Sequence, residues 1–514
     1  MKTFTLSEIE AHSSPGDCWI VVDEAVLDVS KFAALHPGGE QLLYQVGGKD
    51  ATDEFYGLHR KDVLRKFRDR LQIGVVEGRE RPVGDNAAAV CAIPFTEFLR
   101  EHRPCYGQSH KQLRAHLREF IAEHIADVAE ECEQTEAPIP PEIHRKLGEA
   151  GIYAAANGPK LLPAEYAGQL PRGIELGRMD YHHEAVLHSE FARLLTPGFE
   201  DGLFGGRHIS VPPIMWFAAP QVSAAIVPRI LRGETQAALA ITEPFAGSDV
   251  RALRTTMEKS ACGQYWIVNG TKKWITEGLN ADHFVTLCAD KATGRQSMLL
   301  INTADSPGVS TKLIKSVYSS AANTATVEFQ DVRVPVQNLL GKEGDGFLIC
   351  MQNFNHERWV TAVKMVARAR RVLEESLKWA LQRRAFGKRL IDLVAIQEKL
   401  AAAVSRCEAC QCWLESITDR MDQLSFEEQN VKLAGEIALV KYEAAQLGHV
   451  VADAAVVTLG GRAMTRGGMG RLVERYQRTY RLAGTYGGST DVMATLGIRQ
   501  GILRQLPAEG VSRL

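Results

Sequence analysis

Two histidines in the first part of the chain have the surroundings expected of a pair of iron ligands. His36 opens the segment His36-Pro37-Gly38-Gly39-Glu40, and His59 follows it. A low-spin b-type haem needs two neutral imidazoles, one on each face of its iron. The Pro-Gly-Gly turn separates the first imidazole from its own backbone. The pattern predicts that His36 and His59 are axial ligands of a haem iron.

A second group of residues, in the middle of the chain, has the makings of a flavin pocket. Residues 242–249 read Thr-Glu-Pro-Phe-Ala-Gly-Ser-Asp, and Trp274-Ile275-Thr276 follows. A turn of small residues lets backbone N–H groups come close to the pyrimidine edge of a flavin, and Trp274 offers an aromatic face. Either segment alone would indicate no more than a polar turn beside a strand. Together they predict flavin contacts from Thr242, Ala246, Gly247, Ser248, Trp274, Ile275 and Thr276.

Several domains must hold these residues, because 514 residues exceed the usual size of one domain. Short alternating runs on either side of Asp23-Glu24 predict strands. Helical periodicity dominates before and after a strand-rich middle, in which Asn269-Gly270 predicts a hairpin turn. We expect a small α+β domain at 1–77, a linker at 78–93, a helical domain at 94–232, a β-domain at 233–340, a second helical domain at 341–507 and a tail at 508–514.

The composition excludes some classes of partner. Lys and Arg (60) nearly balance Asp and Glu (62), and the net charge of −2 argues against nucleic-acid binding. The sequence contains no run of about 18 apolar residues, so we expect no membrane span. Scattered cysteines are typical of a reducing compartment. The ending Ser512-Arg513-Leu514 resembles a peroxisomal import signal, which predicts an import receptor as partner and a peroxisomal rather than a cytoplasmic location.

The whole first module resembles the cytochrome b5 family. The resemblance rests on Trp19, Phe32, the His36–Glu40 segment and Gly48-Lys49-Asp50-Ala51-Thr52 ahead of His59. It implies a b-type haem held by His36 and His59. The alternative is a relative that serves as a steroid-binding or docking module, but such relatives usually lack one of the two axial histidines.

Residues from about 95 to 506 resemble the acyl-CoA dehydrogenase family. The resemblance rests on the 242–249 and Trp274-Ile275-Thr276 segments and on two later motifs, Arg383-Arg384-Ala385-Phe386-Gly387-Lys388 and Leu459-Gly460-Gly461. It implies a multidomain fold: a helical N-terminal domain, a β-barrel-like middle domain and a C-terminal four-helix bundle. FAD and an acyl-CoA are the expected cofactor and substrate.

The later motifs imply an oligomer. In the family, the first motif grips the pyrophosphate of FAD bound mainly by a neighbouring subunit, and the Gly-Gly pair contacts the same nucleotide. The resemblance therefore implies a homodimer or homotetramer, with FAD contacts from Arg383, Phe386, Gly460, Gly461, Ser489, Thr490 and Asp491. Leu393-Val394 and Val457 stand where the family often has Gln, so two alternatives stay open: a lower affinity for FAD, or nucleotide contacts made by other residues such as Gln397.

The catalytic base is expected at an unusual position. Many family members carry it in a Tyr-Glu-Gly-Thr segment, which here reads Tyr486-Gly487-Gly488-Ser489. Glu357 instead stands where the long-chain and isovaleryl branches place their base. The resemblance implies that Glu357 removes the α-proton, that the N–H of Gly487 binds the thioester oxygen, and that burial raises the pKa of Glu357. Ser248, Arg358, Gly487 and Gly488 are the expected substrate contacts.

The expected reaction is α,β-dehydrogenation of an acyl-CoA to the trans-2-enoyl-CoA, with the fused haem draining electrons one at a time. Three alternatives stay open: a flavoprotein as electron acceptor, oxidase-type discharge to O₂, and a non-catalytic flavoprotein of the same fold. Acyl chain length is not specified by the sequence. Fatty-acid breakdown and secondary metabolism would use the same chemistry.

A histidine-rich helix raises the question of a metal site. His182, His183 and His188 lie close to Glu184 and Glu190. Nothing in their spacing directs three ligands to one face of a helix, so a solvated or interhelical role is the favoured interpretation.

Overall fold

The structure is a computed structural model, and it describes residues 2–59, 61–79, 105–158, 162 and 174–505. Most of the predicted linker at 78–93 and the whole predicted tail, with Ser512-Arg513-Leu514, lie outside the described residues. Peroxisomal import therefore stays a prediction. Within the described part of the chain, no helix has the length and apolar character that crossing a membrane requires.

The first domain is a five-stranded sheet with short helices. The strands, in sheet order, are β1 (Lys2–Phe4), β5 (Gln72–Val76), β4 (Ala25–Asp28), β3 (Asp17–Val22) and β2 (Ser13–Ser14). The helices are α1 (Leu6–Glu10), α2 (Glu40–Gln45), α3 (Thr52–Leu58) and α4 (Lys61–Leu71). The strands predicted around Asp23-Glu24 are confirmed: β3 and β4 pair there, and Asp23 has a φ of 58° in the turn.

A helical domain comes next. Its helices are α7 (Gln108–His124), α8 (Ala126–Thr135), α9 (Pro141–Glu149), α10 (Ile152–Ala155), α11 (Tyr181–Ala192), α12 (Pro197–Glu200), α13 (Arg207–Phe217) and α14 (Pro220–Leu231). Asp180 caps α11 by accepting the backbone N–H of His183. Between α12 and α13, Asp201–Gly205 form the π-helical turn η4. π-Helical turns are rare in proteins, and those that occur are often found at functional sites.

The middle domain is an open eight-stranded sheet with the order β11-β12-β8-β7-β9-β10-β13, in which β6 pairs with β9. Its strands are β6 (Ala237–Ala240), β7 (Thr256–Lys259), β8 (Tyr265–Ile275), β9 (His283–Asp290), β10 (Gln296–Asn302), β11 (Val309–Leu313), β12 (Ala325–Pro335) and β13 (Leu339–Leu340). Helices α13 and α14 pack on one face, where Ile214 and Val227 join the same core as Val285. On the other face Trp266 and Phe329 share a core. The predicted barrel-like shape needs correction, because no hydrogen-bonded ladder among the described strands joins β11 to β13.

The predicted hairpin turn at Asn269-Gly270 is wrong, because β8 runs through both residues. Gly270 has a φ of 152°, and a Cβ there would lie 2.5 Å from Oγ1 and 2.6 Å from Cα of Thr255. The paired strand β12 is irregular at the same place, between Phe329 and Val332. The glycine therefore permits a close approach of β7 to β8, and not a chain reversal.

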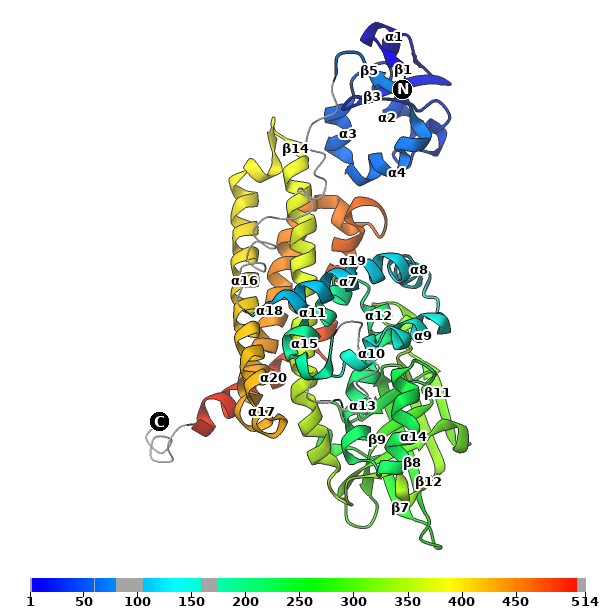
Figure 1. Cartoon of the computed structure of the whole chain (residues 1–514), viewed down its shortest axis with the longest axis vertical. Coiled ribbons are helices and arrows are strands. Elements are labelled where there is room, and N and C mark those ends of the chain that lie inside the picture. The colour runs from blue at the N-terminus through cyan, green and yellow to red at the C-terminus, as the bar shows by residue number, and fades with distance from the viewer. Residues whose placement is uncertain (1, 60, 80–104, 159–161, 163–173, 506–514) are drawn as a thin grey trace. The chain divides into compact units, whose positions relative to one another are not determined.

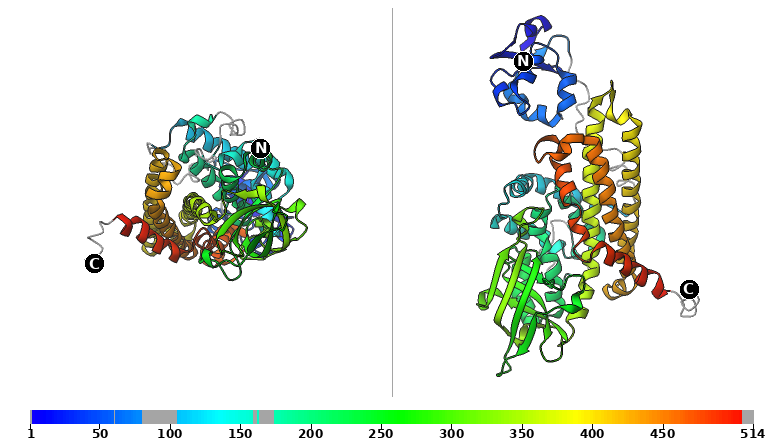
Figure 2. Two further views of the ribbon diagram at one scale, coloured as in Figure 1. Left: turned by 90° about the horizontal axis from the view of Figure 1, so that it is seen from below. Right: turned by 180° about the vertical axis from the view of Figure 1, so that it is seen from behind.

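The C-terminal domain is the predicted helix bundle. Its main helices are α15 (Gly346–Gln382), α16 (Val394–Gln423), α18 (Ala434–Leu459) and α20 (Thr490–Gly501), with the shorter α17 (Phe426–Lys432) and α19 (Arg471–Thr479). The long helices α15, α16 and α18 run side by side (Figures 1 and 2). Trp359 on α15 donates to Thr418 on α16, and Arg406 on α16 pairs with Glu443 on α18.

A Gly270→Ala substitution should destabilise the middle domain. The new methyl group would press on the Thr255 backbone, and overpacking of this kind typically costs about 1–3 kcal/mol. Thermal unfolding should show a lower midpoint for this variant than for the native protein. Gly177→Ala is the matched control, because a Cβ at Gly177 meets nothing within 4 Å. Equal midpoints for the two variants would contradict the close-approach explanation.

Candidate functional site

Glu357 and Gly487, far apart in the sequence, lie next to one another. A Cβ built on Gly487 would stand 3.2 Å from Oε1 of Glu357. Glu357 lies on α15 and is only 7% exposed, whereas Gly487 lies in the loop before α20 with a φ of 65°. The carboxylate thus takes the space beside a backbone that carries no side chain. The structure brings together the two residues on which the predicted chemistry depends.

Two cations hold the loop that contains Gly487. The Nζ atom of Lys441 donates to the carbonyls of Tyr486 (2.7 Å) and Gly488 (2.6 Å), and Nε of Arg358 donates to the carbonyl of Gly487 (2.9 Å). In a trans peptide the N–H points away from the preceding carbonyl. The N–H of Gly487 is therefore directed away from Lys441, and its orientation is fixed by that contact.

The site controls the protonation of Glu357 through opposing effects. Burial raises the pKa of Glu357, while the nearby charges of Lys441 and Arg358 lower it. Oε2 of Glu357 has no hydrogen-bond partner among the described residues. A buried carboxylate with a raised pKa and a free oxygen is what a general base near neutral pH requires. Burial also lowers the pKa of Lys441, to about 7.

The predicted flavin turn is anchored by a buried ion pair. Lys272 on β8 is fully buried, and its Nζ donates to Glu243 (2.9 Å) and to the carbonyls of Ile241 (3.1 Å) and Leu287 (2.7 Å). Burial alone would raise the pKa of Glu243, but Lys272 and the hydrogen bonds to its carboxylate hold it below its usual value. The pair fixes the turn after β6 against the end of β8. Sequence reasoning missed both residues because neither belongs to the expected contact set.

The predicted ring contacts are presented on this anchored frame. Trp274 has a φ of 63°, which is strained for an aromatic residue, and is 54% exposed, whereas Ile275 beside it is buried. A Cβ on Gly247 would meet nothing within 4 Å, so its backbone is open to a ligand. A strained, exposed indole beside an open glycine turn fits a flavin ring. The separate flavin contacts expected of Thr242, Ala246, Ser248 and Thr276 stay predictions.

The residues predicted for the nucleotide half of FAD lie in a different part of the chain. Arg383 follows the end of α15, about seven helical turns after Glu357. Phe386 is 92% exposed with a φ of 53°, at the tip of the hairpin between β14 (Arg384–Ala385) and β15 (Lys388–Arg389). A Cβ on Gly460 or Gly461 would meet nothing within 4 Å. The backbone of both glycines is open to a ligand, and contact of Arg383, Phe386, Gly460 and Gly461 with FAD stays a prediction.

The three residues after Gly488 begin α20. Ser489 caps the helix by accepting the N–H of Val492, and Thr490 donates to the carbonyl of Gly484 (3.3 Å). Asp491 lies exposed in the first turn. These roles position the loop that carries Gly487. Contact of these residues with a flavin stays a prediction.

The two predicted haem ligands face one another in the first domain. The ring centroids of His36 and His59 are 5.9 Å apart. Nδ1 of His36 lies 2.9 Å from the carbonyl of Gly39, and Nδ1 of His59 lies 3.3 Å from that of Phe55. Metal-binding imidazoles are typically oriented by a hydrogen bond from the other ring nitrogen. These contacts leave both Nε2 atoms available, and burial lowers the pKa of His59, which favours the neutral ligand form.

The surroundings of these histidines also fit a haem. A Cβ on Gly38 would lie 2.9 Å from Cε1 of His36, which explains the glycine. Leu35 (71%), Leu42 (43%) and Leu58 (37%) are unusually exposed near the pair in the sequence. Exposed apolar side chains gathered around a site are typical of a ligand-binding surface. The donor set and its apolar surroundings therefore suit an iron porphyrin.

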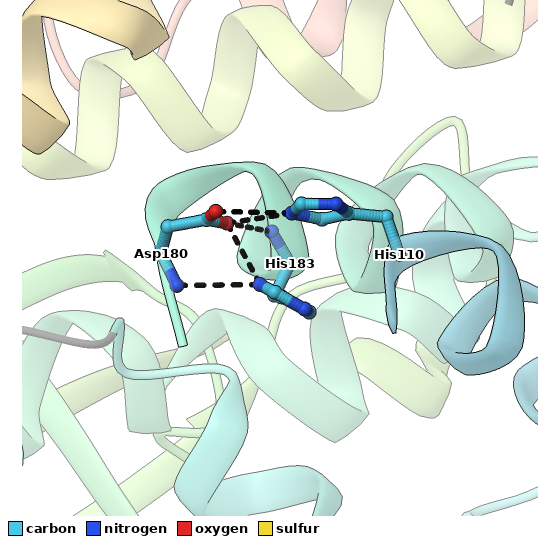
Figure 3. A group of neighbouring side chains, drawn as sticks. All are labelled: His110, Asp180 and His183. Carbon is cyan, nitrogen blue, oxygen red and sulfur yellow. Dashed lines mark hydrogen bonds and ion pairs between the residues drawn. The ribbon is translucent and has the colours of Figure 1, made fainter. Parts of the chain in front are cut away.

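The histidine-rich helix forms interhelical contacts. His182 lies 2.7 Å from Asp419 on α16. Figure 3 shows the Asp180 carboxylate in contact with both His110 and His183, at 2.9 and 2.7 Å, and ligand-type atoms of the three residues lie within 4.8 Å of one another. Each also has a structural partner: His110 accepts the N–H of Gly107, Asp180 caps α11, and Nε2 of His183 lies 3.1 Å from Oγ of Ser109. The favoured interhelical interpretation therefore agrees with the structure.

The fold and the site define a class of enzyme. The chain combines a helical domain, a sheet and a helix bundle, and it has a buried glutamate that faces a bare glycine and an anchored turn suited to a flavin. This arrangement belongs to flavin-dependent oxidoreductases that act on acyl thioesters.

Comparison with known proteins agrees with this class. Residues 107–234, 238–332 and 344–502 match the N-terminal, middle and C-terminal domains of acyl-CoA dehydrogenases. Residues 5–77 match the cytochrome b5-like heme/steroid binding domain. The chain belongs to the acyl-CoA dehydrogenase family, carries a cytochrome b5-like domain ahead of it, and is an FAD-dependent oxidoreductase.

Individual relatives cover nearly the whole dehydrogenase part. The acyl-CoA dehydrogenase apdG of Emericella nidulans is 33% identical over 80% of this chain and 96% of its own length. The acyl-CoA dehydrogenase AFT10-1 of Alternaria alternata is 32% identical over 79% of this chain and 95% of its own length. An acyl-CoA dehydrogenase from Bacillus anthracis solved with FAD superposes with a TM-score of 0.69 at 26% identity, over 78% of this chain and 70% of that one.

Replacing Lys441 by Met should change the pH dependence of catalysis. The positive charge of Lys441 lowers the pKa of Glu357, so its loss should raise that pKa. Because the base must be ionised, the acidic limb of a pH profile of flavin reduction by acyl-CoA should move to higher pH. Lys432→Met, which removes an exposed lysine paired with Glu428, should leave the profile in place. An unchanged profile in Lys441→Met would contradict the assigned electrostatics.

Proposed function

We propose that the dehydrogenase part oxidises an acyl-CoA thioester to the trans-2-enoyl-CoA, with Glu357 as the catalytic base. The observation that carries this proposal is the buried Glu357 carboxylate beside the bare backbone of Gly487. Removal of an α-proton needs a carboxylate at the α-carbon and polarisation of the thioester carbonyl. Glu357 supplies the carboxylate, and the adjacent N–H of Gly487 supplies the donor that polarises the carbonyl.

Each residue then has a defined task. Glu357 accepts the α-proton through its unpartnered Oε2. The N–H of Gly487 binds the thioester oxygen as negative charge develops there, and the loss of such a donor typically costs about 3 kcal/mol of barrier. Arg358 and Lys441 hold that N–H in position through the neighbouring carbonyls. Their positive charges also favour the ionised form of Glu357.

FAD would be held by the anchored turn at 242–249 and by Trp274-Ile275-Thr276. The Bacillus anthracis relative, solved with FAD, supports this choice of cofactor. FAD supplies the acceptor for the hydride that leaves the β-carbon. The Glu243–Lys272 pair keeps the turn rigid, so the turn loses little conformational entropy when FAD binds.

We also propose that the first domain binds a b-type haem through His36 and His59 and serves as the electron exit. The facing imidazoles and their oriented Nδ1 atoms support haem binding. A haem iron changes by one electron at a time, and covalent fusion to the dehydrogenase keeps such an acceptor at high local concentration.

Replacing Glu357 by Gln should abolish the chemistry while leaving the flavin bound. Without oxygen, acyl-CoA should bleach the flavin absorbance of the native protein, and the variant should be slower by a factor of about 10²–10⁴ because its base is missing. Glu398→Gln, at an exposed position of α16, is the matched control. Bleaching at the native rate in Glu357→Gln would mean that another residue is the base. If acyl-CoA does not bleach the flavin of the native protein, a non-catalytic flavoprotein is favoured.

Replacing His59 by Ala should separate the two redox functions. In stopped-flow mixing with acyl-CoA under anaerobic conditions, the native protein should show flavin reduction followed by haem reduction. The variant should reduce its flavin but give no haem signal. His12→Ala is the control, since His12 belongs to the same domain but stacks on Trp19 and pairs with Asp17. A native haem that stays oxidised would point to O₂, to be checked by peroxide release, or to a separate flavoprotein.

A further inference from the structure

Buried charged side chains continue along the face of α15 that carries Glu357. Lys364 and Arg368 follow Glu357 two and three helical turns later, so they share its stripe of the helix. Both are nearly buried and contact the buried Glu200 at the end of α12, at 3.2 Å and 2.6 Å. Beyond Glu357, this stripe of α15 therefore carries buried, paired charges where an apolar stripe would be usual.

Asp201, which follows Glu200, is the carboxylate of this group that lacks a direct partner. It is 5% exposed, and the nearby cations Lys364 and Arg368 pair with Glu200 instead of with Asp201. Burial raises the pKa of Asp201, to about 6, against the opposing charges of Lys364 and Arg368. Asp201 is therefore mostly ionised at neutral pH and can only accept hydrogen bonds.

The position of Asp201 links the two sides of the proposed substrate site. The point where a Cβ of Gly205 would stand is 2.8 Å from Cγ2 of Thr276 and 3.7 Å from Cγ of Asp201. After burial itself, the charge of Asp201 contributes most to raising the pKa of Tyr486. Thr276 belongs to the expected flavin segment and Tyr486 precedes Gly487, so Asp201 lies near the flavin segment and its charge acts on the residue before Gly487.

The local backbone is shaped to bring Asp201 there. Asp201–Gly205 form the π-helical turn η4, and Gly205 approaches Thr276 so closely that a Cβ would not fit at normal contact distance. Turns of this kind are frequent at functional sites. A carboxylate left buried without a donor is unfavourable, and a bound ligand that donates to it removes that cost.

We propose that the acyl chain of the substrate carries a hydroxyl group that donates a hydrogen bond to Asp201. The inference rests on the proposed function of the Glu357 site and names the substrate class as hydroxyacyl-CoA. A saturated chain offers no donor and would leave the carboxylate unpaired. Sites built to bind a hydroxyl discriminate strongly against the analogue that lacks it.

The test compares chains that differ only in the hydroxyl. Hexanoyl-CoA, palmitoyl-CoA and the 4-, 5- and 6-hydroxyhexanoyl-CoAs are mixed anaerobically with the FAD-loaded full chain, and kcat/KM for flavin bleaching is measured. At least one hydroxyhexanoyl-CoA should exceed hexanoyl-CoA by tenfold or more. In Asp201→Leu this preference should disappear and hexanoyl-CoA should improve. Asp305→Asn, at an exposed position, is the matched control.

The outcomes separate this inference from the proposed function. If hexanoyl-CoA or palmitoyl-CoA bleaches the native flavin as well as every hydroxy compound, Asp201 does not select a hydroxyl, while the dehydrogenase function stands. If no acyl-CoA bleaches the flavin, the proposed function itself fails. Should Asp201→Leu lose its flavin or unfold, Asp201→Asn replaces it: the preference should then fall without vanishing, because the amide oxygen still accepts. A full preference in Asp201→Asn together with native folding would also overturn the inference.

Discussion

The carboxylate of Glu357 lies directly against the bare backbone of Gly487. The carboxylate stands so close to the Cα of residue 487 that a Cβ there would lie 3.2 Å from it. A Cβ at 487 would already press on this carboxylate, and a second glutamate side chain there would compete with Glu357 for the same space. The bare backbone at 487 is therefore the complement of the glutamate on α15, and it leaves the N–H of Gly487 free for the substrate. The proposed proton transfer depends on the absence of a side chain at position 487.

Charge organises the structure around that space. Lys441 and Arg358 hold three successive carbonyls of the loop, and the same cations offset part of the effect of burial on Glu357. A second ionic pair, Lys272 with Glu243, fixes the turn offered to the flavin. Burying a pair of charges costs desolvation free energy, so such a pair adds little to stability. Removing one partner is strongly destabilising, because it leaves the other charge buried and uncompensated. Such pairs suit positions where orientation matters more than stability.

Sequence reasoning reached the domain order and the pairing of Glu357 with Gly487, because these depend on local motifs and on resemblance. It failed where tertiary contact overrides a local signal. Asn269-Gly270 has the composition of a hairpin turn, yet the glycine is needed inside β8 to let Thr255 approach. Lys441 was missed because a lone lysine in a long helix carries no sign that it will meet a loop many residues later. The π-helical turn at Asp201–Gly205 likewise has no clear sequence signature.

The most direct test of the account is the structure of the FAD-loaded protein with an acyl-CoA analogue whose β-carbon is replaced by sulfur, so that no hydride can leave. The carboxylate of Glu357 should lie about 3–3.5 Å from the α-carbon. The nitrogen of Gly487 should lie about 2.7–3.1 Å from the thioester oxygen. An α-carbon placed against a different carboxylate, or a Glu357 side chain turned away from it, would contradict the central claim.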